Sequence, residues 1–60
     1  MRVTVAFNRR DEANWWCGYN GLPGVWGRAV MDNSIYGMSL IFDFPPEAAV
    51  LATVFALKFA

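Results

Sequence analysis

Residues 9–28 contain most of the side chains that are suited to binding another molecule. Tryptophan, tyrosine and arginine dominate the energetics of protein interfaces, because each combines a large contact area with a polar group. Every tryptophan of the chain falls in this segment, together with one tyrosine and three of the arginines. The candidate contact residues are Trp15, Trp16, Tyr19, Trp26, Arg9, Arg10 and Arg28. Their chemistry predicts a surface that binds a second protein.

The same residue types suit two other roles. Single-stranded nucleic acid stacks its bases on aromatic rings while arginines follow its phosphates, but the net charge of the chain is zero, which disfavours this role. Alternatively, one or two tryptophans cover the open end of a small core, and Trp26 and Arg28 stack on each other. Trp15 and Trp16 are adjacent, so on an extended segment they point in opposite directions and one of them is exposed or bound.

The chain offers little chemistry for catalysis or metal binding. Cys17 is the only cysteine and there is no histidine, so the chain cannot build an intrachain disulfide, a cysteine–base pair or an ordinary structural zinc site. We expect Cys17 to be buried and inert. The carboxylates are scattered, with Asp11-Glu12 in a polar stretch and Asp43 and Glu47 on either side of a Pro-Pro pair. The sequence predicts a protein that is not an enzyme and that holds no metal and no cofactor.

Length and composition favour association with a partner. A chain of 60 residues is predicted to form one domain over residues 1–60, and such a domain hides only about 60% of the surface that its unfolded chain exposes. Hydrophobic residues make up 57% of the chain, which is more than one small core can enclose. With disulfides and zinc excluded, binding to another protein or to further copies of itself remains as a way to cover this surface.

Two parts of the chain have strand patterns. In residues 2–8, apolar and more polar residues alternate, as the two-residue repeat of a half-buried strand requires. Residues 25–31 and 34–44 flank Asp32-Asn33, a pair that tolerates the positive φ of a two-residue hairpin turn. The inward residues of the first strand are Val3, Val5 and Phe7.

The hairpin register follows from the two-residue turn. It pairs Met31 with Ser34 and Val25 with Leu40. A slip of one residue would exchange the two faces of the hairpin, so the separation of residue types favours this register. One face then carries Val25, Ala29, Met31, Tyr36, Met38, Leu40, Phe42 and Phe44.

The C-terminal segment is predicted to be a helix. Pro45-Pro46 ends the preceding strand, because proline supplies no ladder donor. Pro46 suits the first helical position, Glu47 suits the first turn, and several alanines follow. The arc of bulky side chains predicted to pack on the sheet consists of Val50, Leu51, Val54, Phe55, Leu57 and Phe59. The alternative is a strand over residues 51–59, which would make the fold an all-β sheet of four strands.

Residues 9–24 form an excursion between these elements that carries most of the aromatic candidates. Residues 8–14 are polar and predict an exposed connection. Glycine then recurs at every third position from Gly18 to Gly27. This period is typical of a collagen-like strand, but the run is too short for one. We therefore interpret it as two turns, one at Asn20-Gly21 and one over residues 22–25.

These observations predict an α+β fold, in which a small antiparallel sheet of three strands carries a C-terminal helix on one face. We expect a small non-catalytic protein-binding module, a stoichiometric inhibitor or accessory subunit, a class that includes the antagonists of host complexes that phages encode. The first alternative is a self-associating structural subunit, and the second is a single-stranded nucleic-acid binder. No apolar stretch suits a signal-peptide core or a membrane span, so we expect a cytoplasmic protein.

Overall fold

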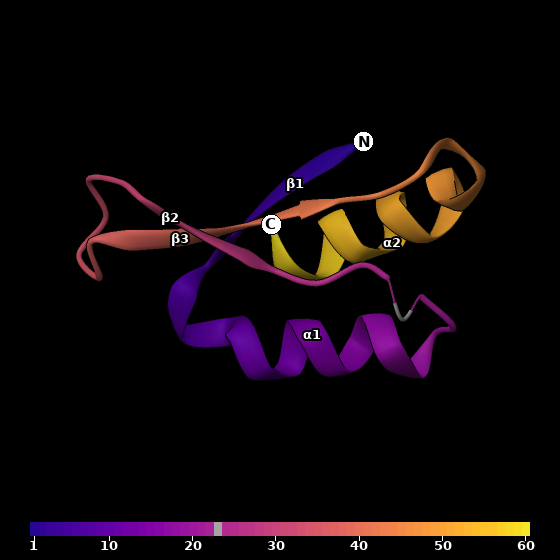
Figure 1. The fold of residues 1–60 in the computed structure, drawn as a ribbon, viewed down its shortest axis with the longest axis horizontal. Coiled ribbons are helices and arrows are strands. Elements are labelled where there is room, and N and C mark those ends of the chain that lie inside the picture. The colour runs from indigo at the N-terminus through magenta and orange to yellow at the C-terminus, as the bar shows by residue number, and fades with distance from the viewer. Residues whose placement is uncertain (23) are drawn as a thin grey trace.

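The computed structural model describes residues 1–22 and 24–60. Within these residues the chain forms strand β1 (Arg2–Ala6), helix α1 (Arg10–Tyr19), strands β2 (Arg28–Met31) and β3 (Met38–Asp43), and helix α2 (Ala49–Phe59). Both helices lie on the same side of the sheet (Figure 1). Short 3-10 helices at Phe7–Arg9 and Pro46–Ala48 lead into α1 and α2. The predicted α+β fold, antiparallel sheet and C-terminal helix are confirmed, whereas α1 was not predicted.

β3 is the central strand of the sheet and pairs antiparallel with β1 on one side and β2 on the other. Val3 lies opposite Phe42 and Val5 lies opposite Leu40, and all of these side chains are buried. The inward face predicted for the first strand is therefore confirmed at these positions. The strand is shorter than predicted, because the chain turns into a 3-10 helix at Phe7.

The predicted hairpin register is wrong. Met31 pairs with Met38 instead of Ser34, and β2 starts only at Arg28, so Val25 precedes the strand. The shift in register is an even number of residues, which leaves each side chain of β3 on its predicted face. Four apolar residues of the face listed above are accordingly buried in the core beneath the helices. They are Val25, Leu40, Phe42 and Phe44.

The Asp32 side chain holds the loop of residues 32–37 together. Its carboxylate accepts hydrogen bonds from the Ser34 N–H, at 2.9 Å, and from the Ser39 hydroxyl. A polar side chain that bonds to the loop in this way takes the place of the predicted two-residue turn. The loop projects beyond the helices at one end of the molecule (Figure 1).

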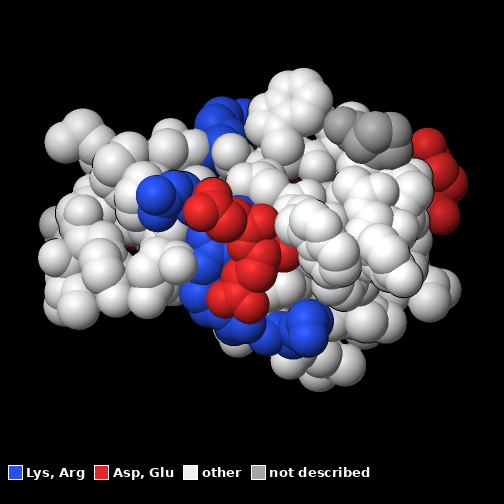
Figure 2. Space-filling model, turned by 90° about the horizontal axis from the view of Figure 1, so that it is seen from below, with Lys and Arg blue, Asp and Glu red and all other residues white. Residues whose placement is uncertain are grey.

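Helix α1 occupies residues that were predicted to form an exposed connection and a turn. Asp11 and Glu12 lie in its first turn, where the helix dipole favours negative charge. Seen from the α1 side, charged side chains gather around the start of the helix, and the face beyond them is largely uncharged (Figure 2). Ala13 and Cys17 lie on the inner side of the helix and are buried. The polar segment is therefore the start of an amphipathic helix.

Gly21 ends α1 with a Schellman motif. Its φ of 77° lies in the left-handed region, which glycine adopts without steric cost. The Leu22 N–H donates to the Cys17 carbonyl at 2.9 Å, and the Gly21 N–H donates to the Gly18 carbonyl at 3.3 Å. These bonds satisfy carbonyls that the end of a helix leaves without partners. The first predicted turn is thus a helix cap, and the second includes Pro23, which lies outside the described residues.

Helix α2 confirms the helical prediction for the C-terminal segment and excludes the strand. Its predicted inward face is right at Phe55 and Phe59 and wrong at three other positions. Alanines allow the helix backbone to approach the sheet closely, and two phenylalanines fill the remaining space. The inward face consists of Ala48, Ala52, Phe55 and Phe59. The residues that were predicted to pack inward and are exposed are Val50, Val54 and Leu57. Over the described part of the chain, no helix has the length and apolar character that crossing a bilayer requires.

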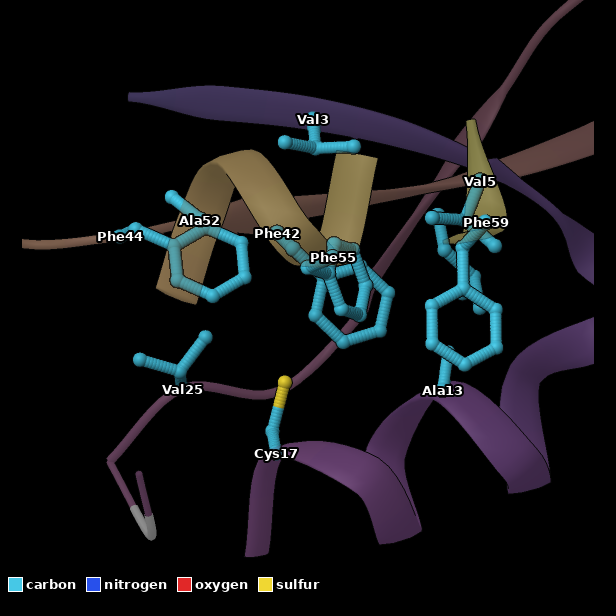
Figure 3. Packing of buried hydrophobic residues seen from close by; sticks show 11 residues of the cluster. Val3, Val5, Ala13, Cys17, Val25, Phe42, Phe44, Ala52, Phe55 and Phe59 are labelled. Carbon is cyan, nitrogen blue, oxygen red and sulfur yellow. The ribbon is translucent and has the colours of Figure 1, made fainter. Parts of the chain in front are cut away.

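The core fills the space between the sheet and the two helices (Figure 3). Phe55 is at its centre, with its ring centroid 4.8 Å from Phe42, 5.0 Å from Phe44 and 4.8 Å from Phe59. Tilted ring pairs at such spacings add stability beyond the apolar area that they bury. The Cys17 side chain points into this cluster from α1 (Figure 3). Phenylalanines of the sheet and of α2 thus supply most of the packing.

Candidate functional site

Trp15 and Tyr19 form a stacked pair on the outer side of α1. They are four residues apart, which places them on the same helix face. Their ring centroids are 4.8 Å apart with an interplanar angle of 15°. Trp15 is 65% exposed and Tyr19 is 75% exposed. Two large rings are therefore held in a fixed arrangement on a helix, with most of their surface open.

Trp26 is the third exposed aromatic residue of this region, at 67%. The backbone on either side of it is fixed, because Val25 is buried and the Gly27 N–H donates to Asn14 Oδ1 at 2.8 Å. Since Asn14 directly precedes Trp15, this hydrogen bond ties the segment that carries Trp26 to α1. We refer to Trp15, Tyr19 and Trp26 as the aromatic surface.

Gly27 allows the segment that carries Trp26 to lie against the core. A Cβ atom at this position would be 2.8 Å from Phe42 Cζ and 3.2 Å from Leu40 Cδ1. Carbon atoms do not approach so closely without displacement of one of them. The absence of a side chain at Gly27 therefore sets how close this segment lies to β3, and with it the position of Trp26.

Trp16 and Arg9, which the sequence placed among the contact residues, have partners within the chain. The Trp16 ring is half-buried and lies 5.5 Å from Phe55 and 6.3 Å from Phe59, measured between centroids. The Arg9 guanidinium lies 4.7 Å from the Phe59 ring centroid. It also donates to Glu12 Oε1 at 3.0 Å and to a backbone carbonyl of α2 at 3.2 Å. Trp16 thus joins α1 to α2, and Arg9 joins the 3-10 helix before α1 to α2.

Arg10 and Arg28 lie apart from each other. Arg10 covers the Phe7 ring at 4.8 Å. Arg28 is paired with Ile41 in the sheet on the face opposite the helices, where its Nη2 lies 3.7 Å from Asp43 Oδ2. No cation–π contact joins Arg28 to Trp26 within the described residues. The structure therefore distributes the predicted arginines over separate places instead of gathering them beside the aromatic surface.

Cys17 is fully buried between α1 and the core. Burial raises the pKa of its thiol, because an apolar environment disfavours the thiolate. A thiol that is both enclosed and protonated is a poor nucleophile at neutral pH. The structure thus agrees with the expectation of an inert cysteine.

A depression with a volume of about 530 Å³ lies where the end of β3 meets the segment after α1. The carboxylate of Asp43 at its edge accepts a hydrogen bond from Arg2 Nε at 2.8 Å. This bond and the nearby Arg28 hold the pKa of Asp43 below its ordinary value, so the carboxylate is ionised at neutral pH and unsuited to proton transfer. Across residues 1–22 and 24–60, no three potential metal ligands come together. The depression is lined by Gly21, Leu22, Gly24, Val25, Asp43, Phe44 and Pro45.

Two further exposed apolar groups were not among the predicted site residues. One lies at the hairpin end of the molecule, where Met31, Ile35 and Tyr36 are exposed. The other is the outer face of α2, where Val50, Val54 and Leu57 are exposed although they were predicted to pack in the core. The spacing of alanines at positions 48, 52 and 56 is the signal that would have identified the true inner face, because residues four apart share one side of a helix.

Comparison of the chain with known protein families, curated protein sequences and solved structures finds no significant match. A function can therefore be argued only from the exposed side chains and from the elements that hold them.

Proposed function

We propose that this protein is a small non-catalytic protein-binding module, which acts as a stoichiometric inhibitor or accessory subunit by covering part of a partner's surface. The observation that carries the proposal is the exposed Trp15–Tyr19 stack on α1. Large aromatic rings contribute strongly to affinity when a partner removes them from water. Rings that are already stacked on a helix lose little conformational freedom on binding, which favours affinity further.

The aromatic surface also defines the chemistry of the partner. The indole N–H groups of Trp15 and Trp26 are donors, and the Tyr19 hydroxyl is both donor and acceptor. A complementary partner has an apolar patch for the rings and carbonyl or carboxylate oxygens at its rim for these donors. We place this interaction in the cytoplasm, since a chain with a single cysteine suits a reducing compartment.

Nucleic acid is the less favoured partner. Of the arginines near the aromatic residues in sequence, Arg9 is engaged by Glu12 and by α2, and Arg28 is drawn toward Asp43. Arg10, whose guanidinium lies 4.8 Å from the Phe7 ring centroid, has no carboxylate partner among the ion pairs of the described residues. One such cation is little charge for binding a phosphate backbone. Titration with a single-stranded oligonucleotide at increasing salt tests this alternative, because phosphate binding weakens steeply as salt rises.

The proposal is tested by capture followed by titration. The immobilised chain is used to capture a protein from the lysate of its own cells, and the purified partner is then titrated with wild-type and variant chains. Trp15→Ala should weaken binding by about 2 kcal/mol or more, which is about 30-fold in Kd. Ile35→Ser, at an even more exposed apolar position on the hairpin loop, is the control and should leave Kd unchanged. Equal effects of the two substitutions would contradict the proposed surface.

A further inference from the structure

The outer face of α2 is an apolar strip. Val50 is 78% exposed, Val54 is 46% exposed and Leu57 is 85% exposed. Their spacing places them on one side of the helix, opposite the buried side that carries Phe55 and Phe59. No charged residue occurs between Glu47 and Lys58, so nothing in this stretch favours contact with water over contact with another apolar surface.

The strip is bordered by small residues that allow close contact. Ala49 and Thr53 are exposed beside it. The Thr53 hydroxyl donates to the Ala49 carbonyl at 3.0 Å, so its hydrogen-bonding need is already met within the helix. A second helix can therefore approach over methyl groups, at the separation of about 8 Å that small contact residues permit, without burying an unsatisfied polar group.

The charges at the two ends of the strip are complementary to each other. Glu47 lies in the 3-10 helix at the N-terminal end of the strip, and Lys58 lies in the last turn of α2, where its Nζ is 5.7 Å from the Phe59 ring centroid. Both residues are exposed. The ion pairs within the described residues involve other side chains. When two copies are related by a two-fold axis perpendicular to α2, Glu47 of each copy lies beside Lys58 of the other. A parallel arrangement would instead bring like charges together.

We propose that α2 binds α2 of a second copy of this chain, with the two helices antiparallel about a two-fold axis. Val50, Val54 and Leu57 of each copy form the apolar centre of this contact, and the Glu47–Lys58 pairs fix its direction. The inference goes beyond the proposed function, since it uses a different helix from the aromatic surface. A dimer of this kind presents two aromatic surfaces.

Sedimentation velocity of the full chain tests the dimer. From about 1 μM to about 1 mM, the range in which a weak helix-pair dimer dissociates, the wild-type protein should change from monomer to dimer. Leu57→Ser should raise the dimer Kd by about ten-fold or more, whereas Ile35→Ser should not change it. A wild-type monomer at every concentration, or a dimer that Leu57→Ser leaves intact, would overturn the proposal.

Charge exchange separates a direct contact from an effect on helix stability. Glu47→Lys or Lys58→Glu alone places like charges together across the two-fold axis and should weaken the dimer. The double variant restores opposite charges and should recover the wild-type Kd to within about two-fold. Because both substitutions oppose the helix dipole, a purely structural effect makes the double variant the weakest of all. A double variant that dimerises more weakly than either single variant would overturn the antiparallel arrangement. Far-UV circular dichroism of each variant checks that α2 is still helical.

The two proposals fail independently. Trp15→Ala should leave the sedimentation behaviour unchanged, and Leu57→Ser should leave the affinity of each aromatic surface for its partner unchanged. Loss of both activities with either substitution would show that the two helices do not act separately, which would overturn the dimer contact as described.

Discussion

At the scale of single residues, the two glycines at positions 18 and 27 illustrate how the same residue type serves different purposes. Gly27 lies against Phe42 and Leu40, where an added Cβ has no room. Gly18 lies in α1 and is exposed, and an added Cβ would meet no atom within 4 Å. The first glycine is required by packing, while the second only weakens its helix.

Alanine substitutions at these two positions should therefore have opposite effects. Gly27→Ala forces the Phe42 ring or the backbone to move and should lower the free energy of unfolding by about 1–3 kcal/mol. Gly18→Ala should raise it by about 0.5–1 kcal/mol, because alanine favours the helix and restricts the unfolded chain. Urea denaturation of both variants measures the two changes. A shift of the same sign in both would contradict the packing role of Gly27.

Cys17 provides a second prediction at this scale. Since the thiol is buried and its pKa is raised, an aromatic disulfide reagent at pH 8 should label it only after local or global opening. The labelling rate of the native protein should be at least about a hundred-fold lower than in concentrated urea, as expected for a core position. Comparable rates in the two conditions would show that the α1 side of the core is open.

Part of the candidate site was predictable from residue types alone. Exposed aromatic residues were expected in residues 9–28, and Trp15, Tyr19 and Trp26 have this property. On an extended segment one of the two adjacent tryptophans was expected to be exposed; the segment is instead helix α1, on which Trp15 is exposed and Trp16 packs against the core. The roles of Trp16 and Arg9 could not be predicted, because both depend on the position of Phe59, more than forty residues away in the sequence.

At the scale of elements, α1 was missed because its amphipathic pattern is weak. Its first turn contains only polar residues and alanine, and Gly18 disfavours a helix. The acidic pair Asp11-Glu12 was the available signal for a helix start. On α2 the pattern was ambiguous for the opposite reason, since apolar residues surround the helix and its inner face is decided by the shape of the core.

The two faces of α2 give a prediction that separates core from surface. Phe55→Ala should lower the free energy of unfolding by about 3–5 kcal/mol, because Phe55 is fully buried and packs against several other rings. A chain of this length has a total stability of about 3–9 kcal/mol, so this loss is a large share of it and should lower the midpoint of unfolding steeply. Leu57→Ala, measured at concentrations where the protein is monomeric, should change stability by less than about 0.5 kcal/mol. Thermal unfolding by circular dichroism provides both values, and similar losses would contradict the assignment of faces.

At the scale of the whole molecule, the charges predict how stability depends on pH. Bonding to Arg9 lowers the pKa of Glu12, and bonding to Arg2 lowers the pKa of Asp43. A carboxyl group whose pKa is lowered by folding stabilises the folded state above its unfolded pKa and loses this contribution as pH falls through the folded pKa. The raised pKa of Cys17 acts in the other direction, because its contribution is lost as pH rises above the unfolded value.

Stability should therefore be constant between about pH 6 and pH 8, where no group of this chain with a shifted pKa titrates, and should fall below about pH 4. Asp43→Asn should reduce the acid-dependent part of this loss. The midpoint of thermal unfolding, measured from pH 2 to 8 in steps of about one unit, records the plateau and the acid limb. A midpoint that rises on acidification would show that the ion pairs of Glu12 and Asp43 do not support the fold.

Within the described residues, exposed apolar and aromatic side chains gather at the aromatic surface, on the outer face of α2 and at the hairpin end of the molecule. Most apolar residues of one sheet face are enclosed by the two helices, so the remaining apolar area is confined to a few places. The sequence predicted that such area would remain, because the composition exceeds what a core of this size can hold. Its location could not be predicted, since it depends on which side of each helix faces the sheet.

The central claim is that the aromatic surface is covered when the protein binds its partner. Acrylamide quenching of tryptophan fluorescence tests it most directly, using the Trp16→Phe chain so that only Trp15 and Trp26 emit. Free chain should be quenched readily, as expected for exposed indoles. Chain saturated with its purified partner, with the partner's own emission subtracted, should be quenched several-fold less. Equal quenching in the free and bound states would place the contact elsewhere on the molecule and contradict the proposed function of Trp15 and Trp26.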